Sequence, residues 1–213
     1  MNCRNDRKIL SEVEAACLAV NEAAQRVLPG MPGLANYYES RLELGEMLTD
    51  PERFLLIYIA TMFPQDTQVL EIAAGAAQLS AGLALLGFQH VSAIEIDRDR
   101  AALAKTLCEA ACPGKVNVVR RAWQEWVCLL KHPGPGLLVT WNAVSSQCSK
   151  EREAKTFQTW WNTGGDIILC PALYGKQDDN FMLVSYGRTL PYDLFHLHHS
   201  HIGGRHHAVL PID

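Results

Sequence analysis

The sequence contains no Cys-x-x-Cys pair, although seven cysteines are scattered through its 213 residues. Paired cysteines at that spacing are typical of zinc sites, and a regular cysteine framework is typical of small secreted proteins, so neither class is indicated. The N-terminal residues are polar and charged and lack the apolar segment of a secretory signal peptide. We therefore expect a protein of the reducing cytoplasm.

Long apolar runs and a strong excess of one charge are also missing. The longest apolar run, residues 54–63, has about ten residues, whereas a membrane-spanning helix needs about 20. The net charge is −4, from 19 basic and 23 acidic residues, and a general nucleic-acid-binding protein usually has a basic surface. We expect neither a membrane nor a nucleic acid as partner. Hydrophobic residues make up 48% of the chain, which excludes intrinsic disorder.

The first 63 residues have helical patterns throughout. Apolar residues recur at steps of three and four over 11–27, and a second helix is expected over 35–47. Asp50 before Pro51 and Glu52 predicts the start of a third helix, because aspartate caps helices and proline suits the first turn. We predict a helical N-terminal lid over residues 1–63.

From residue 64 onward, short apolar segments alternate with helical ones. Strands are predicted at 68–73, 91–96, 116–119, 137–141 and 167–170, with helices at 79–86, 98–111, 124–130 and 150–161. Such alternation indicates a parallel sheet with helices on both faces. The segments 181–186, 194–201 and 207–212 are predicted to be antiparallel strands. The fold class expected for residues 64–213 is α/β, a Rossmann-like doubly wound sheet that is mostly parallel with antiparallel C-terminal strands.

One strand–turn–helix segment has the residues of a nucleoside site. An apolar strand at 69–72 leads into a turn of small residues, 73–77, which opens a helix. Small side chains let a ligand approach the backbone, and the helix N-terminus presents free N–H groups. Glu95 ends the next strand, about 20 residues after Gly75, and its carboxylate can accept hydrogen bonds from both hydroxyls of a ribose.

This segment resembles the class I S-adenosylmethionine-dependent methyltransferases, whose first motif reads acidic-x-Gly-x-Gly-x-Gly. The four defined positions are taken by Glu71, Ala73, Gly75 and Ala77. The residues Ala-Ile-Glu-Ile-Asp at 93–97 are similar to the end of the family's second strand, with Glu95 at the ribose-binding position. The resemblance implies that the methionine part of S-adenosylmethionine lies against the turn 73–77. It also implies that Glu71 helps to orient this turn. Alanine replaces glycine at 73 and 77, which restricts φ and adds a methyl group beside the ligand.

The resemblance also assigns the other cofactor contacts. After the third strand the family often has an acidic residue that binds the adenine amino group, whereas this chain has Arg-Arg-Ala-Trp at 120–123, so Trp123 could stack on the purine instead. The expected cofactor-binding residues are Glu71, Ala73, Ala74, Gly75, Ala77, Glu95, Ile96, Ala122, Trp123 and Asn142. Two other interpretations stay open: a helix–sheet contact without a ligand, and a nicotinamide dinucleotide site.

Three residues are candidates for the acceptor side of the site. Asn142 follows the fourth strand, where the family often presents a polar side chain to the transferred methyl group. Tyr38 shares a helix face with Arg41, which suits contact with a carboxylate or an aromatic acceptor, although a tyrosine there can also simply pack on the sheet. The histidine-rich tail includes His198, a candidate general base. A metal site or a solvated edge strand are alternatives for the tail, and no metal ligands are assigned.

The resemblance predicts an enzyme that transfers the methyl group of S-adenosylmethionine to a small-molecule acceptor by in-line displacement. Two alternatives remain. A nicotianamine synthase-like enzyme would transfer the aminocarboxypropyl group of the same cofactor, and a non-catalytic module would only bind the nucleoside. The acceptor and the oligomeric state are not determined by the sequence.

Overall fold

The computed structural model of the chain describes residues 6–129, 136–141, 159–160, 165–170 and 184–186. Its N-terminal part is helical: α1 (Asp6–Val27) is followed by the short 3₁₀ helix η1 (Leu28–Gly30), α2 (Pro32–Glu43) and α3 (Asp50–Met62). The buried residues Val13, Cys17, Val20 and Ala24 recur along α1 at the three- and four-residue spacing of one helix face. The predicted N-terminal helices are therefore present.

The start of α3 differs from the sequence-based expectation. The capping residue is Thr49, which has extended backbone angles, and Asp50 is already the first helical residue. The Glu52 carboxylate accepts the backbone N–H of Thr49 at 2.7 Å, as in a capping box, where a threonine precedes a glutamate by three residues. The prediction that Asp50 caps this helix was wrong, because a carboxylate inside the first turn reaches back to satisfy the free N–H.

A six-stranded sheet forms the centre of the molecule, in the order β3-β2-β1-β4-β5-β6. The strands are β1 (Gln68–Ile72), β2 (His90–Glu95), β3 (Val116–Arg120), β4 (Gly136–Trp141), β5 (Asp166–Cys170) and β6 (Val184–Tyr186). The first five are parallel, and β6 runs antiparallel to β5. The strand order reverses between β1 and β4, and in open α/β sheets ligands bind at such a reversal, beyond the carboxyl ends of the strands.

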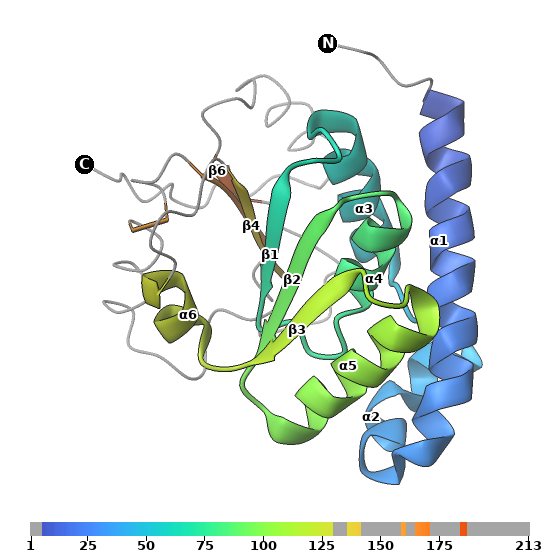
Figure 1. Cartoon of the computed structure of the whole chain (residues 1–213). Coiled ribbons are helices and arrows are strands. Elements are labelled where there is room, and N and C mark those ends of the chain that lie inside the picture. Colours follow the sequence, from blue (N-terminus) through green and yellow to red (C-terminus); the bar gives the residue numbers. More distant parts are fainter. Residues whose placement is uncertain (1–5, 130–135, 142–158, 161–164, 171–183, 187–213) are drawn as a thin grey trace, which may run out of the picture.

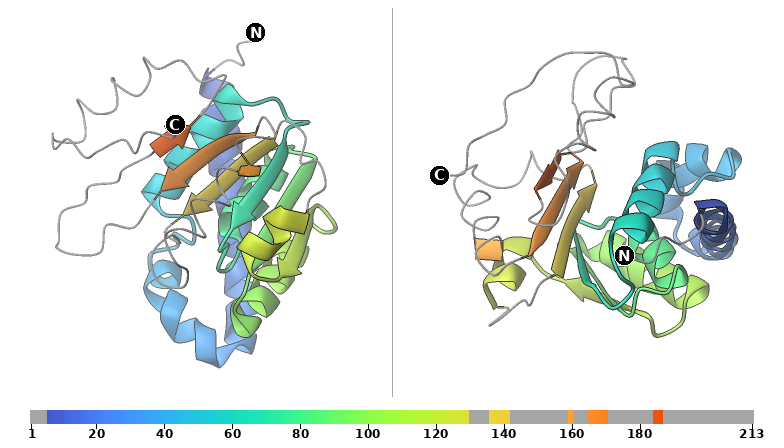
Figure 2. Two further views of the ribbon diagram at one scale, coloured as in Figure 1. Left: turned by 90° about the vertical axis from the view of Figure 1, so that its left-hand side faces the viewer. Right: turned by 90° about the horizontal axis from the view of Figure 1, so that it is seen from above.

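Helices cover both faces of the sheet. The helices α4 (Gln78–Leu85) and α5 (Arg98–Ala111) lie on one face together with α1 and α3, and α6 (Trp123–Leu129) lies on the other, as Figures 1 and 2 show. The larger hydrophobic cluster joins α1–α5 to the first face of the sheet. A smaller cluster on the second face contains Leu70, Ile72, Ile94, Trp123, Val127, Leu138 and Trp160. This arrangement confirms the predicted Rossmann-like α/β fold class.

Several predictions fall on other parts of the chain. The strands expected at 194–201 and 207–212 lie outside the described residues, as does the helix expected at 150–161 except for residues 159–160, which are helical. The division into a lid over 1–63 and a domain over 64–213 stays a prediction, and α1–α3 share one hydrophobic cluster with the sheet. Among the described residues, no helix has the length and apolar character needed to cross a membrane.

Candidate functional site

The turn after β1 has an unusual backbone. Ala73, Gly75 and Ala77 all have left-handed conformations, with φ values of 52°, 56° and 56°. Glycine adopts this conformation freely, but in an alanine the Cβ approaches the following carbonyl oxygen at a cost of roughly 1–2 kcal/mol. The three residues occupy the positions at which the resembled methyltransferase motif has glycine. The chain therefore has a left-handed backbone at two positions where its residue type opposes it.

Hydrogen bonds to the neighbouring strand hold this turn in place. The N–H of Ala74 donates to the carbonyl of Ile94 in β2 at 3.0 Å, and the N–H of Ala77 donates to the carbonyl of Ala74 at 2.7 Å. The N–H of Gly75 donates to the Glu95 carboxylate at 2.7 Å. The contacts with Ile94 and Glu95 come from β2, about 20 residues along the chain, so tertiary structure maintains the strained turn.

Glu95 lies beside the turn at the carboxyl end of β2. Its side chain is 5% exposed, and its second oxygen accepts the N–H of Asp97 at 2.9 Å. A carboxylate has about four lone-pair positions, and two are used by the N–H groups of Gly75 and Asp97. About two positions remain, as many as the hydroxyls of a ribose require. The geometry thus combines two tasks in one carboxylate: it fixes the turn and keeps acceptor capacity for a ligand.

Glu71 is the acidic residue at the start of the motif and is also buried. One carboxylate oxygen accepts both the backbone N–H of Ser80 at 2.9 Å and its hydroxyl at 2.5 Å. Burial raises the pKa of Glu71 to about 8, against the opposing effect of the Ser80 bonds, and the negative charges of Glu52 and Glu95 raise it further. Because Ser80 belongs to the first turn of α4, Glu71 ties the end of β1 to the start of that helix.

Apolar and aromatic residues flank the carboxyl ends of β2 and β3. Ile96 follows Glu95 and is 51% exposed, which offers an apolar surface next to the carboxylate. Ala122 is half-buried and precedes α6, where its carbonyl accepts the N–H groups of Glu125 and Trp126. Trp123 is 9% exposed and packs in the smaller hydrophobic cluster. The indole is therefore a core residue in this structure, and little of its surface is available for a base to stack on.

Tyr38 and Arg41 of α2 lie close to the same turn. A Cβ atom built on Gly75 would be 3.4 Å from the Tyr38 hydroxyl, so this buried side chain approaches the turn backbone directly. The Arg41 Nη1 atom donates to the carbonyl of Met47 at 3.2 Å and to Glu52 at 3.3 Å. The fold therefore brings Tyr38 next to the turn, while Arg41 is paired with an acidic residue of the chain itself.

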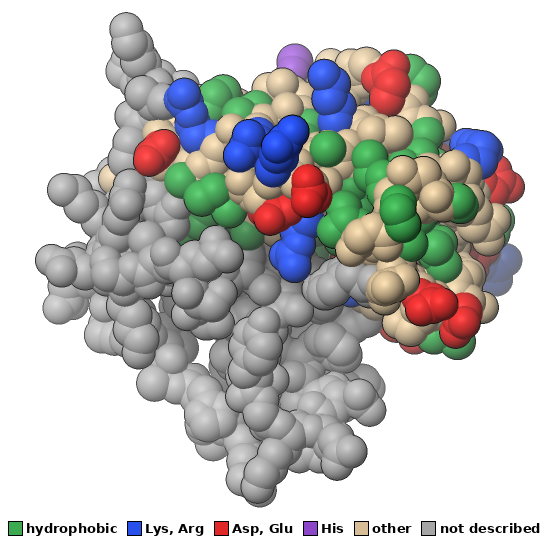
Figure 3. All heavy atoms as spheres, turned by 90° about the horizontal axis from the view of Figure 1, so that it is seen from below, with side chains coloured by type: hydrophobic (Ala, Val, Ile, Leu, Met, Phe, Trp, Pro, Cys, Tyr) green, Lys and Arg blue, Asp and Glu red, His purple; other side chains and the backbone are tan. Residues whose placement is uncertain are grey.

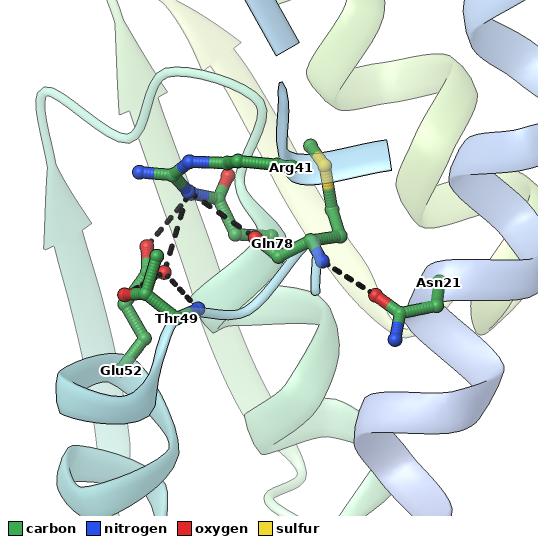
Figure 4. A network of polar contacts seen from close by, with 6 residues as sticks. Asn21, Arg41, Thr49, Glu52 and Gln78 are labelled. Atoms are coloured by element: carbon green, nitrogen blue, oxygen red, sulfur yellow. Dashed lines mark hydrogen bonds and ion pairs between the residues drawn. The ribbon is translucent and has the colours of Figure 1, made fainter. Parts of the chain in front are cut away.

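A buried polar cluster connects these helices with α4 (Figure 4). Its centre is Glu52, which is completely buried and accepts hydrogen bonds from Thr49, Arg41 and the Gln78 side chain. Asn21 of α1 contributes by accepting the N–H of Met47 at 2.6 Å. The roles of Glu52, Gln78 and Ser80 were not predicted from the sequence. The Thr-x-x-Glu spacing at 49–52 is typical of a capping box and could have been recognised in the sequence. The same spacing does not predict that Glu52 is buried against α4.

Two of the predicted site residues, Asn142 and His198, lie outside the described residues, as does the rest of the histidine-rich tail. Among the parts of the chain that the structure describes, no group of three or more histidine, cysteine, aspartate or glutamate side chains is placed to hold a metal ion. The candidate site therefore consists of the turn 73–77 with Glu71, Glu95, Ile96 and Tyr38 around it. Its left-handed backbone and its carboxylate with spare acceptor capacity fit a nucleoside ligand.

No family model matches the sequence, and no curated protein matches it. Among solved structures, the chain is similar to M. capricolum TrmK in complex with S-adenosyl-homocysteine, with a TM-score of 0.49, 12% identity, and coverage of 71% of this chain and 75% of that one. It is also similar to the glycopeptide N-methyltransferase MtfA, determined with the same compound, with a TM-score of 0.45, 16% identity, and coverage of 66% and 65%.

A third similar structure is SMU.472, which was also determined with S-adenosyl-homocysteine. The TM-score is 0.48 and the identity 9%, and the match takes in 66% of this chain. The chain spans about half the length of SMU.472, at 53% of that protein. These are likenesses of fold.

Proposed function

We propose that this protein is an enzyme that binds S-adenosylmethionine at the turn 73–77 and transfers its methyl group to a small-molecule acceptor. The observation that supports this most is the backbone of the turn. Ala73 and Ala77 adopt left-handed conformations that disfavour alanine, with Gly75 between them. Backbone strain of this kind persists where the surrounding structure imposes it, and it clusters at ligand sites.

The surroundings of the turn support the same ligand. Glu95 retains acceptor positions for the two ribose hydroxyls, and the exposed Ile96 next to it provides an apolar contact for a nucleobase. The turn leads into α4, an eight-residue helix whose N-terminus bears a partial positive charge suited to the carboxylate of an amino acid. In this proposal the methionyl part of the ligand lies along the turn and the nucleoside part lies along β2.

The bound cofactor supplies an electrophilic methyl group on a sulfonium. The protein's contribution is to align the acceptor with that methyl group and to keep water away, so no catalytic triad is required. Tyr38 is the described residue best placed to act on the acceptor side, because its hydroxyl lies next to Gly75. Asn142 and His198 are proposed as further acceptor-side residues on the sequence resemblance alone.

The acceptor is proposed to be a small molecule. The net charge of −4 gives no general attraction for a polyanion. On the face shown in Figure 3, lysine and arginine side chains lie among aspartate and glutamate side chains over the described part of the chain. A mixture of both charge signs lacks the basic stripe that a nucleic-acid partner favours.

Calorimetric titration of the purified chain with S-adenosylmethionine and with S-adenosylhomocysteine tests the cofactor proposal. We expect both compounds to bind. In unfolding experiments, either compound at 100 times its Kd should raise the free energy of unfolding by about 2.7 kcal/mol. A Glu95→Ala variant should lose affinity, whereas Glu109→Ala, which changes an exposed glutamate of α5, should bind as the unchanged chain does. Absence of binding by the unchanged chain would contradict the proposal.

Incubation with cofactor labelled in its methyl group tests the reaction and the acceptor class. The label should enter a dialysable fraction of a cell extract and leave S-adenosylhomocysteine as the product. Label in the RNA fraction would contradict the small-molecule proposal. Formation of methylthioadenosine instead would indicate aminocarboxypropyl transfer, and cofactor binding without any transfer would indicate a non-catalytic nucleoside-binding module.

A further inference from the structure

Glu52 is a buried carboxylate that contacts three parts of the chain (Figure 4). One oxygen accepts the backbone N–H and the hydroxyl of Thr49, both at 2.7 Å, and Arg41 at 3.3 Å. The other oxygen accepts the Gln78 side-chain amide at 2.8 Å. Gln78 is the first residue of α4 and directly follows the left-handed Ala77. Glu52 thus reaches from the N-terminal helices to the start of the proposed cofactor-binding helix.

This contact fixes which way the Gln78 amide points. An ionised carboxylate only accepts hydrogen bonds, so Gln78 must present its nitrogen to Glu52 and direct its oxygen elsewhere. That oxygen is buried, in a side chain that is only 7% exposed, and no donor among the described residues reaches it. A buried acceptor without a donor is destabilising, and each such atom in a folded protein calls for an explanation, which a bound ligand can supply.

The charges near Gln78 indicate which kind of hydrogen-bond donor suits its side-chain oxygen. The buried acidic residues Glu52, Glu71 and Glu95 lie close together, and Glu71 keeps its proton at neutral pH because burial raises its pKa to about 8. The negative charges of this group are therefore those of Glu52 and Glu95. Arg41 offsets one of these negative charges through its ion pair with Glu52. Poorly hydrated negative charge favours a cationic donor over a neutral one. The surroundings therefore suit an ammonium group.

We propose that the Gln78 side-chain oxygen accepts a hydrogen bond from the ammonium group at the amino-acid end of S-adenosylmethionine, and that Glu52 is the positioning residue that sets its direction. This inference rests on the proposed function. Glu52 does not touch the ligand, and it acts only by holding the Gln78 amide in one of its two orientations.

The substitution Glu52→Gln tests the orientation. A glutamine at 52 that still accepts the Thr49 N–H presents its own N–H₂ group to Gln78, so the Gln78 amide must turn over and direct its nitrogen toward the ligand. We expect the Kd for S-adenosylhomocysteine to rise about 10- to 100-fold, the range for a lost hydrogen bond to a charged group. The Kd for methylthioadenosine, which has no amino-acid part, should change by less than about twofold.

A double substitution separates positioning from stability. In Glu52→Gln with Gln78→Glu, the new glutamine donates to the new glutamate, whose second oxygen again faces the ligand as an acceptor. The double variant keeps the net charge, and we expect it to recover the affinity for S-adenosylhomocysteine. A merely structural role of Glu52 predicts no such recovery. Asn21→Ala is the matched control, because it loosens the same polar cluster without touching Gln78 and should leave the ratio of the two Kd values unchanged.

A variant that leaves Glu52 in place covers the case in which Glu52→Gln does not fold. Gln78→Met removes the acceptor at nearly constant volume, and the same selective loss of affinity for S-adenosylhomocysteine is expected. An unchanged ratio of the two Kd values in Glu52→Gln or in Gln78→Met, with normal binding by the unchanged chain, overturns this inference alone. Failure of the unchanged chain to bind either compound overturns it together with the proposed function.

Discussion

The burial of Glu71 predicts that the protein loses stability as the pH rises. The pKa of this carboxyl group is raised from 4.5 to about 8 in the folded chain, chiefly by desolvation. Between these values the folded state holds a proton that the unfolded chain has released. Stability therefore falls with increasing pH over this window, and the contribution of the protonated group is fully present only below about pH 4.5.

The size of the effect follows from the same two values. Each unit of difference in pKa is worth about 1.4 kcal/mol, so the slope of the free energy of unfolding approaches about −1.4 kcal/mol per pH unit inside the window. Across the whole window the loss sums to roughly 5 kcal/mol, an upper bound that structural relaxation around Glu71 would reduce. That is a large share of the stability of an ordinary domain, which is about 5–15 kcal/mol.

The assay is urea unfolding at pH 5, 6, 7 and 8 of the unchanged chain and of Glu71→Gln. The glutamine keeps an acceptor for Ser80 and carries no charge, so its curve lacks the contribution of Glu71 while every other group titrates as before. We expect the two proteins to have similar stabilities at pH 5 and the variant to be more stable by several kcal/mol at pH 8. Ser80→Ala removes the hydroxyl hydrogen bond that lowers the pKa of Glu71, so this pKa should be higher in the variant. The stability of the variant should therefore go on falling to a higher pH than that of the unchanged chain.

Parallel curves for the unchanged chain and Glu71→Gln would refute this reasoning. They would mean that the carboxyl group of Glu71 has the same pKa in the folded and unfolded chain, and therefore that it is not buried as the structure places it. A difference of the opposite sign, with the variant less stable at pH 8, would mean that the ionised carboxylate is stabilised by its surroundings.

Other substitutions near the turn have distinct expected outcomes. Glu95→Ala should raise the Kd for S-adenosylhomocysteine by about 10- to 100-fold, measured by calorimetry, because it removes a charged acceptor; equal affinities would show that this carboxylate does not hold the ligand. Gly75→Ala should lower the free energy of unfolding by about 1–2 kcal/mol, because its φ is 56°, a left-handed conformation that opposes a Cβ atom. Ala73→Gly should raise the free energy of unfolding by up to about 1 kcal/mol, because the relief of left-handed strain exceeds the entropic cost of the more flexible unfolded chain. Urea unfolding measures both changes, and a change of the opposite sign in either variant would contradict its prediction.

The sequence predicted the first two strands of the sheet closely because most of their residues are buried. The first strand was expected at 68–73 and is Gln68–Ile72, and the second was expected at 91–96 and is His90–Glu95. A strand covered by helices on both sides is a continuous apolar run between polar turns, which is a local signal. The helix Arg98–Ala111 was expected with the same bounds, and in the structure Asp97 before it accepts the N–H groups of residues 99 and 100 as a cap.

The chemical character of the candidate site was also legible in the sequence. The spacing of Glu71, Gly75 and Glu95 is fixed by the length of one strand–turn–helix–strand unit, so a carboxylate at the end of the second strand had to lie beside the turn. The expectation that alanine at 73 and 77 would restrict the turn was incomplete. The residue type does oppose the left-handed backbone, but contacts from β2 impose it.

Only the tertiary structure decided which polar groups are buried and what they face. Glu52 has the sequence position of an ordinary helix-start glutamate, and its complete burial comes from α2 and α4, whose contributing residues lie 11 positions before it and 26 after it. Trp123 follows a strand, where its indole was expected to stack on the purine, yet the packing of α6 places it in the smaller hydrophobic cluster. Hydrophobic periodicity and turn residues act within a few positions and so determine the elements. Burial, pKa and hydrogen-bond partners depend on groups distant in sequence, so only the packed chain determines them.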